Sequence, residues 1–370
     1  MSPVRTLPRL STRVGLRVTS FVPLLPNRVL APSLFSVSSQ SPSDPPSASA
    51  SASASRRNTS AVHRGVSGGV ALTQAKVAQT HRRLGRVSTQ AAAATMPILQ
   101  ILQGPAYLAI LKLWAVTVVP CCLGFVDPVA VFSTGYGLSC AAAGAVLLAS
   151  ASKTSLGLAA FAHCAGLVAY GMRLAIFLFW RQNFGYPEWR KRAANSPEAR
   201  AKNVAIPVAL CSLFYALLCS PALWASRAAV SGAMPTAASL AAIPTYAKVA
   251  LGVQWFGLIL EAIGDFNKAA SKAANKDKPC MSGVYKFVRH PNYTGEILFW
   301  IGTFVAGVES MLVVGAWTVA PAALGLFGIL SLMFRVTNRL DEKQSEKYSS
   351  DVDDYVAYVK RTKKLIPFVY

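Results

Sequence analysis

The stretch LGLAAFAHCAGLVAYGMRLAIFLFW, residues 156–180, decides the fold of this chain. It carries a single charged side chain, Arg173. A helix needs about 20 mostly apolar residues to cross the hydrocarbon core of a bilayer. We therefore expect this stretch to be a transmembrane helix.

Apolar windows of similar length recur along the chain, which has 53% hydrophobic residues, 14% charged residues and a mean hydropathy of +0.40. The window at 293–308 is the weakest, because Asn292 and Glu296 stand at its start. Together the windows predict an all-α, polytopic membrane protein with about seven transmembrane helices. The other expected spans are 98–120, 129–150, 204–225, 243–264, 293–308 with its flanks, and 311–334.

Basic residues are distributed unevenly between the predicted loops. Segments 181–203, 265–292 and 335–370 hold six, six and eight of them. The loops 121–128, 151–155, 226–242 and 309–310 hold only Lys153 and Arg227. This asymmetry predicts that the three basic segments share one side of the membrane and the other loops the opposite side. The net charge of +22 does not indicate nucleic-acid binding, since no basic patch interleaved with aromatics is visible.

Residues 1–95 differ in composition from the rest of the chain. They contain twelve basic residues, one acid (Asp44) and the run SASASASAS at 47–55. A basic, serine-rich and acid-poor segment is typical of an organelle transit peptide. We expect a disordered transit peptide at 1–95 and a membrane domain at 96–370. A plastid is the expected destination, with the mitochondrion, the endoplasmic reticulum or a plain cytosolic tail as alternatives.

The seven cysteines form no C-x-x-C pair and no cluster with histidine. The sequence therefore predicts neither a metal site nor a disulfide framework.

Arg173 and Tyr170 form the first candidate site. Ionisable groups at membrane depth are costly and therefore mark functional positions, and a spacing of three places both side chains on one helix face. The alternative is an arginine that extends its charged end to the membrane surface.

A second candidate site is GVYKFVRHPNYTGE at 283–296. His290-Pro291 marks a helix start, because proline suits the first helical turn. Arg289 and this helix N-terminus are the features that a phosphate-bearing cofactor requires. The alternative is an interfacial belt of aromatic and basic residues.

The flanking segments add polar candidates. Glu261, Asp265 and Lys268 have the spacing of adjacent helix turns, which also suits a surface ion-pair ladder. The tail after residue 335 is either a solvated amphipathic tail or an element that completes a nucleotide site.

Three motifs carry a family resemblance: E-x-x-x-D-x-x-K at 261–268, G-V-Y-x-F-x-R-H-P-N-Y-x-G-E at 283–296, and Y-x-x-Y-x-x-R-T-x-x-x-I-P at 355–367. They resemble the steroid 5-alpha-reductase superfamily, in the branch long catalogued as a domain of unknown function. The R-H-P-N-Y run is also similar to that of sterol reductases. A related motif occurs in isoprenylcysteine carboxyl methyltransferases, which use S-adenosylmethionine.

The resemblance implies an NADPH-dependent reductase that acts on a carbon–carbon double bond of a lipid-like substrate, such as a steroid, isoprenoid or other enone. Tyr170 and Arg173 would be catalytic, with the tyrosine hydrogen-bonded to the substrate carbonyl. The family's partner glutamate on the second span has no counterpart, because 129–150 contains no acid. The cofactor region would be 261–370, with Asp265, Lys268, Tyr285, Arg289, His290, Asn292, Tyr293, Glu296, Arg339, Glu342 and Tyr348 as binding residues.

The alternatives are an S-adenosylmethionine-dependent membrane methyltransferase and a transporter. Transporters usually show repeats and broken helices at mid-membrane, and no repeat is evident. Neither the residues nor the resemblance indicates an oligomeric state.

Overall fold

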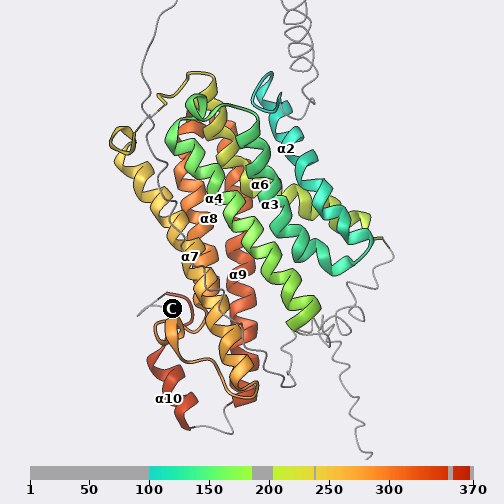
Figure 1. Ribbon diagram of the computed structural model, residues 1–370, viewed down its shortest axis with the longest axis vertical. Helices are drawn as coiled ribbons and strands as arrows, with labels where there is room; N and C mark the ends of the chain where they lie inside the picture. Colours follow the sequence, from blue (N-terminus) through green and yellow to red (C-terminus); the bar gives the residue numbers. More distant parts are fainter. Residues whose placement is uncertain (1–99, 186–202, 237–238, 349–352, 367–370) are drawn as a thin grey trace, which may run out of the picture. The chain divides into compact units, whose positions relative to one another are not determined.

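The computed structural model describes residues 100–185, 203–236, 239–348 and 353–366, and the regular elements within these ranges are all helices (Figure 1). This confirms the predicted all-α class. The predicted transit peptide at 1–95 lies outside the described residues.

Each predicted span corresponds to one long helix. These are α2 (Ala106–Cys121), α3 (Thr134–Ala149), α4 (Lys153–Trp180), α6 (Ala205–Val230), α7 (Thr245–Ala274), α8 (Pro291–Val314) and α9 (Val319–Tyr348). The short elements are η2 (Cys122–Phe125), η3 (Pro128–Phe132), η4 (Arg181–Gly185), η5 (Leu240–Ala242), η6 (Gly283–Lys286), η7 (Ala316–Thr318) and α10 (Asp353–Arg361).

Six helical segments of the described chain are long and apolar enough to cross a membrane. The seventh expected span is α3, which is apolar but has only 16 residues. Helices α7 and α9 have 30 residues each. At 1.5 Å per residue each is about 45 Å long, longer than the roughly 30 Å hydrocarbon core. Their C-terminal turns therefore extend beyond the hydrocarbon.

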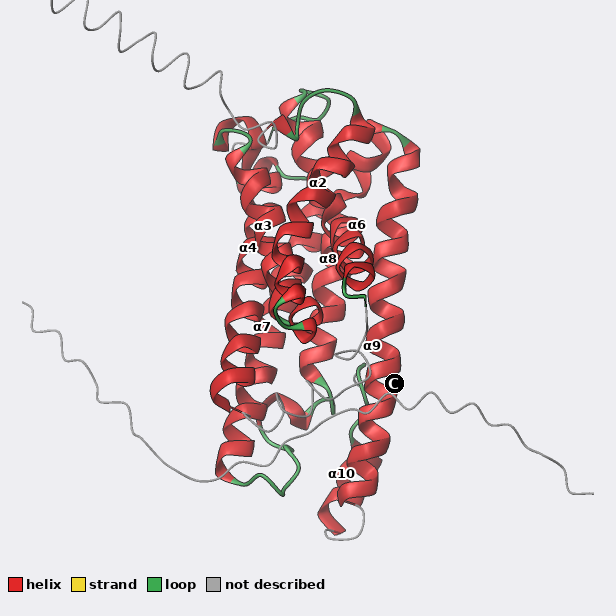
Figure 2. Ribbon diagram, turned by 90° about the vertical axis from the view of Figure 1, so that its right-hand side faces the viewer, coloured by secondary structure: helices red, strands yellow, loops and turns green. Residues whose placement is uncertain are grey.

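The long helices alternate in direction, which brings the C-terminal ends of α4, α7 and α9 to the same end of the bundle as α10 (Figures 1 and 2). The described ends of α4, α7 and α9, where the three basic segments begin, thus lie at one end of the bundle. The expectation for loop 121–128 was wrong. Since α2, α3 and α4 alternate, this loop lies toward the basic end (Figure 1). It contains no Lys or Arg, so the charge asymmetry is unchanged.

Glycines set the distance between the two helices that carry most of the candidate residues. A methyl group added at Gly295 of α8 would lie 2.5 Å from the backbone nitrogen of Glu261 on α7. One added at Gly302 would lie 2.7 Å from the carbonyl oxygen of Ala250. Small residues at such positions let membrane helices approach closely. The close packing of α7 on α8 places the acidic turn of α7 beside the start of α8.

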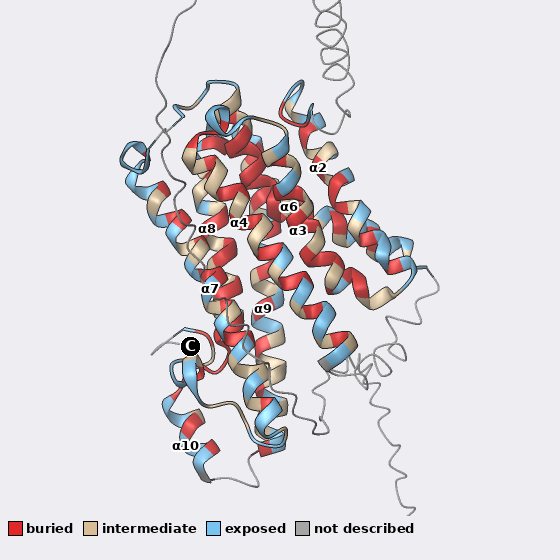
Figure 3. Ribbon diagram, in the orientation of Figure 1, coloured by how far each residue is buried: buried red, intermediate tan, exposed pale blue. Residues whose placement is uncertain are grey.

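Exposed residues lie along several of the long helices (Figure 3), and many of them are large and apolar. Phe256 and Phe266 on α7, and Leu324 and Phe327 on α9, are all exposed. Such a surface is suited to lipid rather than water. The chain is an integral membrane protein with a buried core, and polar side chains inside that core form the site.

Candidate functional site

Two tyrosines and a glutamate from three helices meet in the buried core. Tyr136 of α3 and Tyr170 of α4 donate hydrogen bonds to Glu296 Oε1 of α8, with O···O distances of 3.0 and 3.2 Å. The two phenolic oxygens lie 2.9 Å apart, and Trp300 Nε1 donates to Tyr136 Oη at 2.9 Å. Tyr170 has 0% of its surface exposed and stacks on Phe299 with a 4.1 Å centroid distance. We call Tyr136, Tyr170 and Glu296 the phenol–carboxylate cluster.

The two phenolic oxygens and Glu296 Oε1 lie within hydrogen-bond distance of one another, so the O–H groups can change acceptors by rotation alone. Each phenol of the cluster can donate either to the glutamate or to the other phenol. Low surrounding polarity strengthens such a network. The cluster is therefore able to hold a proton and to pass it between its members.

Arg173 forms an ion-pair cluster one helical turn from Tyr170. Its guanidinium pairs with Glu261 and, at 2.6 Å from Nη1 to Oδ2, with Asp265, both on α7. Asn292 at the start of α8 donates to Asp265 Oδ1 at 3.3 Å. Glu261 is buried and pairs with Arg173 of another helix, so it is not part of a surface ion-pair ladder along α7.

The two clusters touch without sharing a hydrogen bond. The Arg173 guanidinium carbon lies 5.9 Å from the centre of the Tyr170 ring. The Tyr170 hydroxyl is directed instead to Glu296. The charge of Arg173 is turned toward the two carboxylates of α7.

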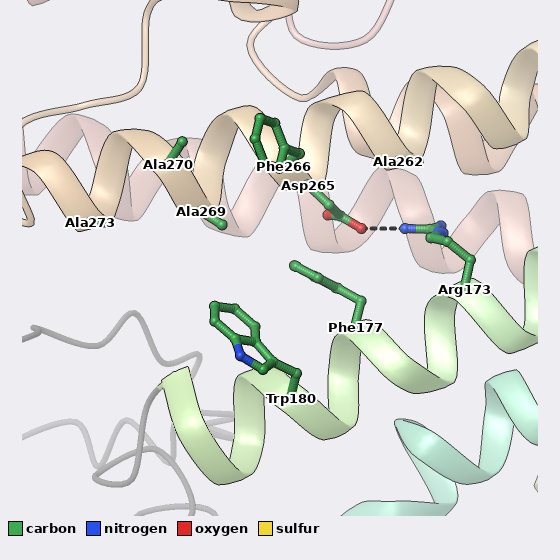
Figure 4. A pocket seen from close by; sticks show the side chains of 9 residues that line it. All are labelled: Arg173, Phe177, Trp180, Ala262, Asp265, Phe266, Ala269, Ala270 and Ala273. Carbon is green, nitrogen blue, oxygen red and sulfur yellow. Dashed lines mark hydrogen bonds and ion pairs between the residues drawn. The ribbon is translucent and has the colours of Figure 1, made fainter. Parts of the chain in front are cut away.

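A cavity of about 430 Å³ opens between α4 and α7 (Figure 4). The Arg173–Asp265 ion pair forms its polar end, and Phe177, Trp180 and Phe266 form apolar walls. The remaining lining residues are small: Ala262, Ala269, Ala270 and Ala273. The cavity suits an apolar or aromatic group whose polar end lies against the ion pair, one turn from Tyr170.

Arg289 holds residues 353–366, which we call the C-terminal segment, against the bundle. Its Nε and Nη2 donate to the two carboxylate oxygens of Asp341 at 2.8 and 2.9 Å. Its Nη1 donates to the carbonyl oxygens of Val359 and Thr362. Arg289 was expected to face phosphates, whereas in this arrangement its donors are engaged by protein acceptors. We call Arg289 and Asp341 the C-terminal clamp.

Neighbouring residues of the motif also support this docking. The backbone N–H groups of Arg289 and His290 donate to the carbonyls of Lys363 and Lys364 at 2.8 and 3.0 Å. The His290 ring stacks on Tyr293, and its Nε2 lies 3.5 Å from Asp341 Oδ1. Burial lowers the pKa of His290, and the nearby carboxylate of Asp341 only partly opposes this shift.

The remaining predicted cofactor residues lie apart from the phenol–carboxylate cluster. The Tyr285 hydroxyl reaches Asn292 Oδ1 at 3.5 Å, and burial raises the pKa of Tyr285 well above its usual value. Tyr348 is buried and accepts a hydrogen bond from Lys272 Nζ at 2.8 Å. Lys268 and Arg339 are half-buried, while Glu342 is exposed.

Sequence reasoning did not single out Tyr136, Trp300 or the pairing of Glu296 with Tyr170. Tyr136 is the only tyrosine in the window 129–150, which is the one signal that marks it. Among the described residues, no group of three or more His, Cys, Asp or Glu side chains is placed to hold a metal ion.

No curated protein and no solved structure matches the chain. One family model does match, over residues 114–362, and its description is "protein of unknown function (DUF1295)". The match covers all the helices that form the phenol–carboxylate cluster, the ion-pair cluster and the cavity. The chain therefore belongs to the DUF1295 family of proteins of unknown function.

Proposed function

We propose that this protein is an NADPH-dependent membrane reductase that reduces a carbon–carbon double bond conjugated to a carbonyl in a lipid-like substrate. The observation that carries the proposal is the phenol–carboxylate cluster, whose Tyr170 lies one helical turn from Arg173 at the polar end of a largely apolar cavity. The resemblance of the three C-terminal motifs to the steroid 5-alpha-reductase superfamily supports it. Family membership alone does not, because DUF1295 proteins carry no assigned activity in their description.

Glu296 offers Tyr170 the acidic partner that the sequence lacks on the second expected span. The second expected span offers no acidic partner for Tyr170, but α8 supplies one from the third helix of the cluster. A tyrosine hydrogen-bonded to a buried carboxyl group is a suitable acid for a substrate carbonyl. Tyr170 would donate its proton to the oxygen, and Glu296 with Tyr136 would return a proton to Tyr170.

The ion-pair cluster would hold the substrate end of the cavity in place. Arg173 is anchored by two α7 carboxylates, so its position is set before any ligand enters. A cation that is fixed in advance can stabilise the negative charge that develops on the oxygen of a bound carbonyl during the reaction. Phe177, Trp180 and Phe266 would give the hydrocarbon part of the substrate an apolar lining.

The described residues fit NADPH in part. The aromatic and alanine lining of the cavity suits a flat nicotinamide ring, and NADPH would supply the hydride. Its phosphates need basic side chains, for which Lys268 and Arg339 at the basic end of the bundle are the candidates. Arg289 is better explained as part of the C-terminal clamp.

The test compares matched variants of the full chain in lipid nanodiscs. NADPH and S-adenosylmethionine are tested separately for an increase in melting temperature, and NADPH oxidation is followed at saturating concentrations of candidate enones. We expect stabilisation by NADPH. We expect Tyr170→Phe to reduce turnover about 10²- to 10⁴-fold, the contribution of a general acid.

Tyr215→Phe is the matched control. Tyr215 is also buried, and its hydroxyl donates to the Val131 carbonyl, outside the phenol–carboxylate cluster. This variant should keep its turnover. Stabilisation by S-adenosylmethionine alone would replace the proposal with the methyltransferase, and unchanged turnover in Tyr170→Phe would remove the role of the tyrosine.

We also propose that residues 1–95 direct the protein to a plastid membrane, on the basis of their basic, serine-rich composition. A fluorescent protein fused to these residues should enter plastids. Delivery to mitochondria or the endoplasmic reticulum would contradict this part of the proposal.

A further inference from the structure

A second group of polar side chains is buried in the bundle, on the helices that carry the phenol–carboxylate and ion-pair clusters. It consists of His163 on α4, Gln254 on α7 and Thr303 on α8, with 1%, 0% and 0% of their surfaces exposed. They precede or follow Tyr170, Glu261 and Glu296 by seven residues each. Seven helical residues span about 10 Å. The three side chains thus form a separate layer, which we call the inner polar layer.

Contacts between the helices bring the three side chains together. Gln254 Nε2 donates to the His163 carbonyl at 3.3 Å, and His163 hydrogen-bonds the backbone of Thr303. A methyl group added at Gly166 would lie 2.7 Å from Gln254 Nε2. The absence of a side chain at Gly166 therefore leaves the space that the Gln254 amide occupies.

One polar atom of each side chain has no hydrogen-bond partner among the described protein groups. These atoms are His163 Nε2, Gln254 Oε1 and Thr303 Oγ1. Buried polar groups in folded proteins nearly always have a partner, since desolvation without a hydrogen bond is costly. Three such atoms on three touching helices point to a shared ligand.

We propose that the inner polar layer is an internal binding site for ordered water. An amide oxygen accepts, a hydroxyl both donates and accepts, and a neutral imidazole nitrogen does either. Water matches this set because it donates and accepts, and buried waters typically have about three such partners. A lipid chain would leave all three atoms unpaired, and a single imidazole beside an amide and a hydroxyl is a poor metal site. The site is independent of the proposed reductase function.

The chain has only four histidines, which makes a direct test possible. The full-length protein is labelled with ¹⁵N-histidine, reconstituted in lipid, and examined by solid-state NMR with magnetisation transferred from water. The His163→Gln variant assigns the His163 signal; if it fails to fold, backbone correlation in the wild type does so. We expect transfer from water to the His163 ring, although the residue lies inside the bundle.

Two threonine variants test whether the water is held by the inner polar layer. Thr303→Val removes one predicted water ligand and should abolish the transfer to His163. Thr318→Val is the matched control, because Thr318 is equally buried but its hydroxyl has two protein acceptors within reach, the carbonyls of Met311 and Gly315, each at 2.9 Å. This control should keep the transfer. No transfer in the wild type, or the same transfer in wild type and Thr303→Val, would overturn the proposal.

Discussion

Asp341→Asn should release the C-terminal segment from the bundle. The substitution keeps the shape of the side chain but removes the charge that pairs with Arg289. The pair is bidentate, with N···O distances of 2.8 and 2.9 Å, and the side chains are 7% and 11% exposed. At such low exposure, solvent screens the interaction little, and Arg289 would be left buried without its counter-charge.

The expected cost follows from this geometry. A hydrogen bond to a charged group contributes about 1.5–3 kcal/mol, and two are weakened here. Removal of one partner from a buried ion pair costs about 3–5 kcal/mol. Because about 1.4 kcal/mol is a factor of ten, opening of the docked segment should become roughly a hundred to several thousand times more frequent.

Amide hydrogen exchange measures this opening directly. The N–H groups of Arg289 and His290 donate to the carbonyls of Lys363 and Lys364, so their exchange requires that the segment leaves. Peptides containing residues 288–290 and 355–364 should exchange faster in Asp341→Asn. The helices of the core, such as α4, should keep their wild-type exchange.

Asp277→Asn is the matched control. Asp277 pairs with Lys347 at 3.8 Å and is 65% exposed, so the pair is strongly screened and should contribute under about 1 kcal/mol. Wild-type exchange at 288–290 in Asp341→Asn would refute the clamp.

Three further predictions follow from the structure. Gly302→Ala places a methyl group 2.7 Å from a backbone oxygen of α7 and should strongly lower the yield of folded protein in detergent. Gly252→Ala is the control and should be tolerated, because a methyl group there would have no atom within 4 Å. Equal yields of the two variants would contradict the packing of α7 on α8. His290 has a lowered pKa in the folded protein, so its contribution to stability is complete above its unfolded pKa of about 6.5 and is lost as the pH falls from there through its folded pKa. The protection of the amides at 288–290, measured relative to their intrinsic exchange at each pH, should therefore fall between pH 7.5 and 5.5, and constant protection would exclude this linkage. Thr303→Val should lower the melting temperature, because loss of the proposed water would leave His163 Nε2 and Gln254 Oε1 buried without a hydrogen-bond partner; an unchanged or raised melting temperature would contradict the proposed water site.

Arg173 shows which properties of the site the sequence predicts and which it does not. Arg173 was identified as a buried functional residue from its place in an apolar window, and the structure does place its charge inside the protein, against Glu261 and Asp265. Its partners could not be derived, since they lie on a helix about ninety residues away in the chain. His290-Pro291 correctly marked the start of α8, because the proline effect is local.

The partners of Glu296 could not be predicted from the sequence either. Its position in the 283–296 motif suggested a cofactor ligand, but its nearest partners are phenols of α3 and α4. The direction of a side chain inside a helical bundle depends on helix rotation and crossing, which depend in turn on glycine contacts such as Gly295 against α7. None of these can be read from spacing within one helix.

The sequence by itself determined the membrane-embedded helical class and the positions of the apolar segments. These follow from the cost of burying charge and backbone polar groups in lipid, which acts on each segment separately. Only the tertiary structure decided that Tyr170 pairs with Tyr136 and Glu296, that Arg289 holds the C-terminal segment, and that His163, Gln254 and Thr303 share a layer. Those relations depend on how helices distant in the chain pack, and packing is a property of the whole bundle.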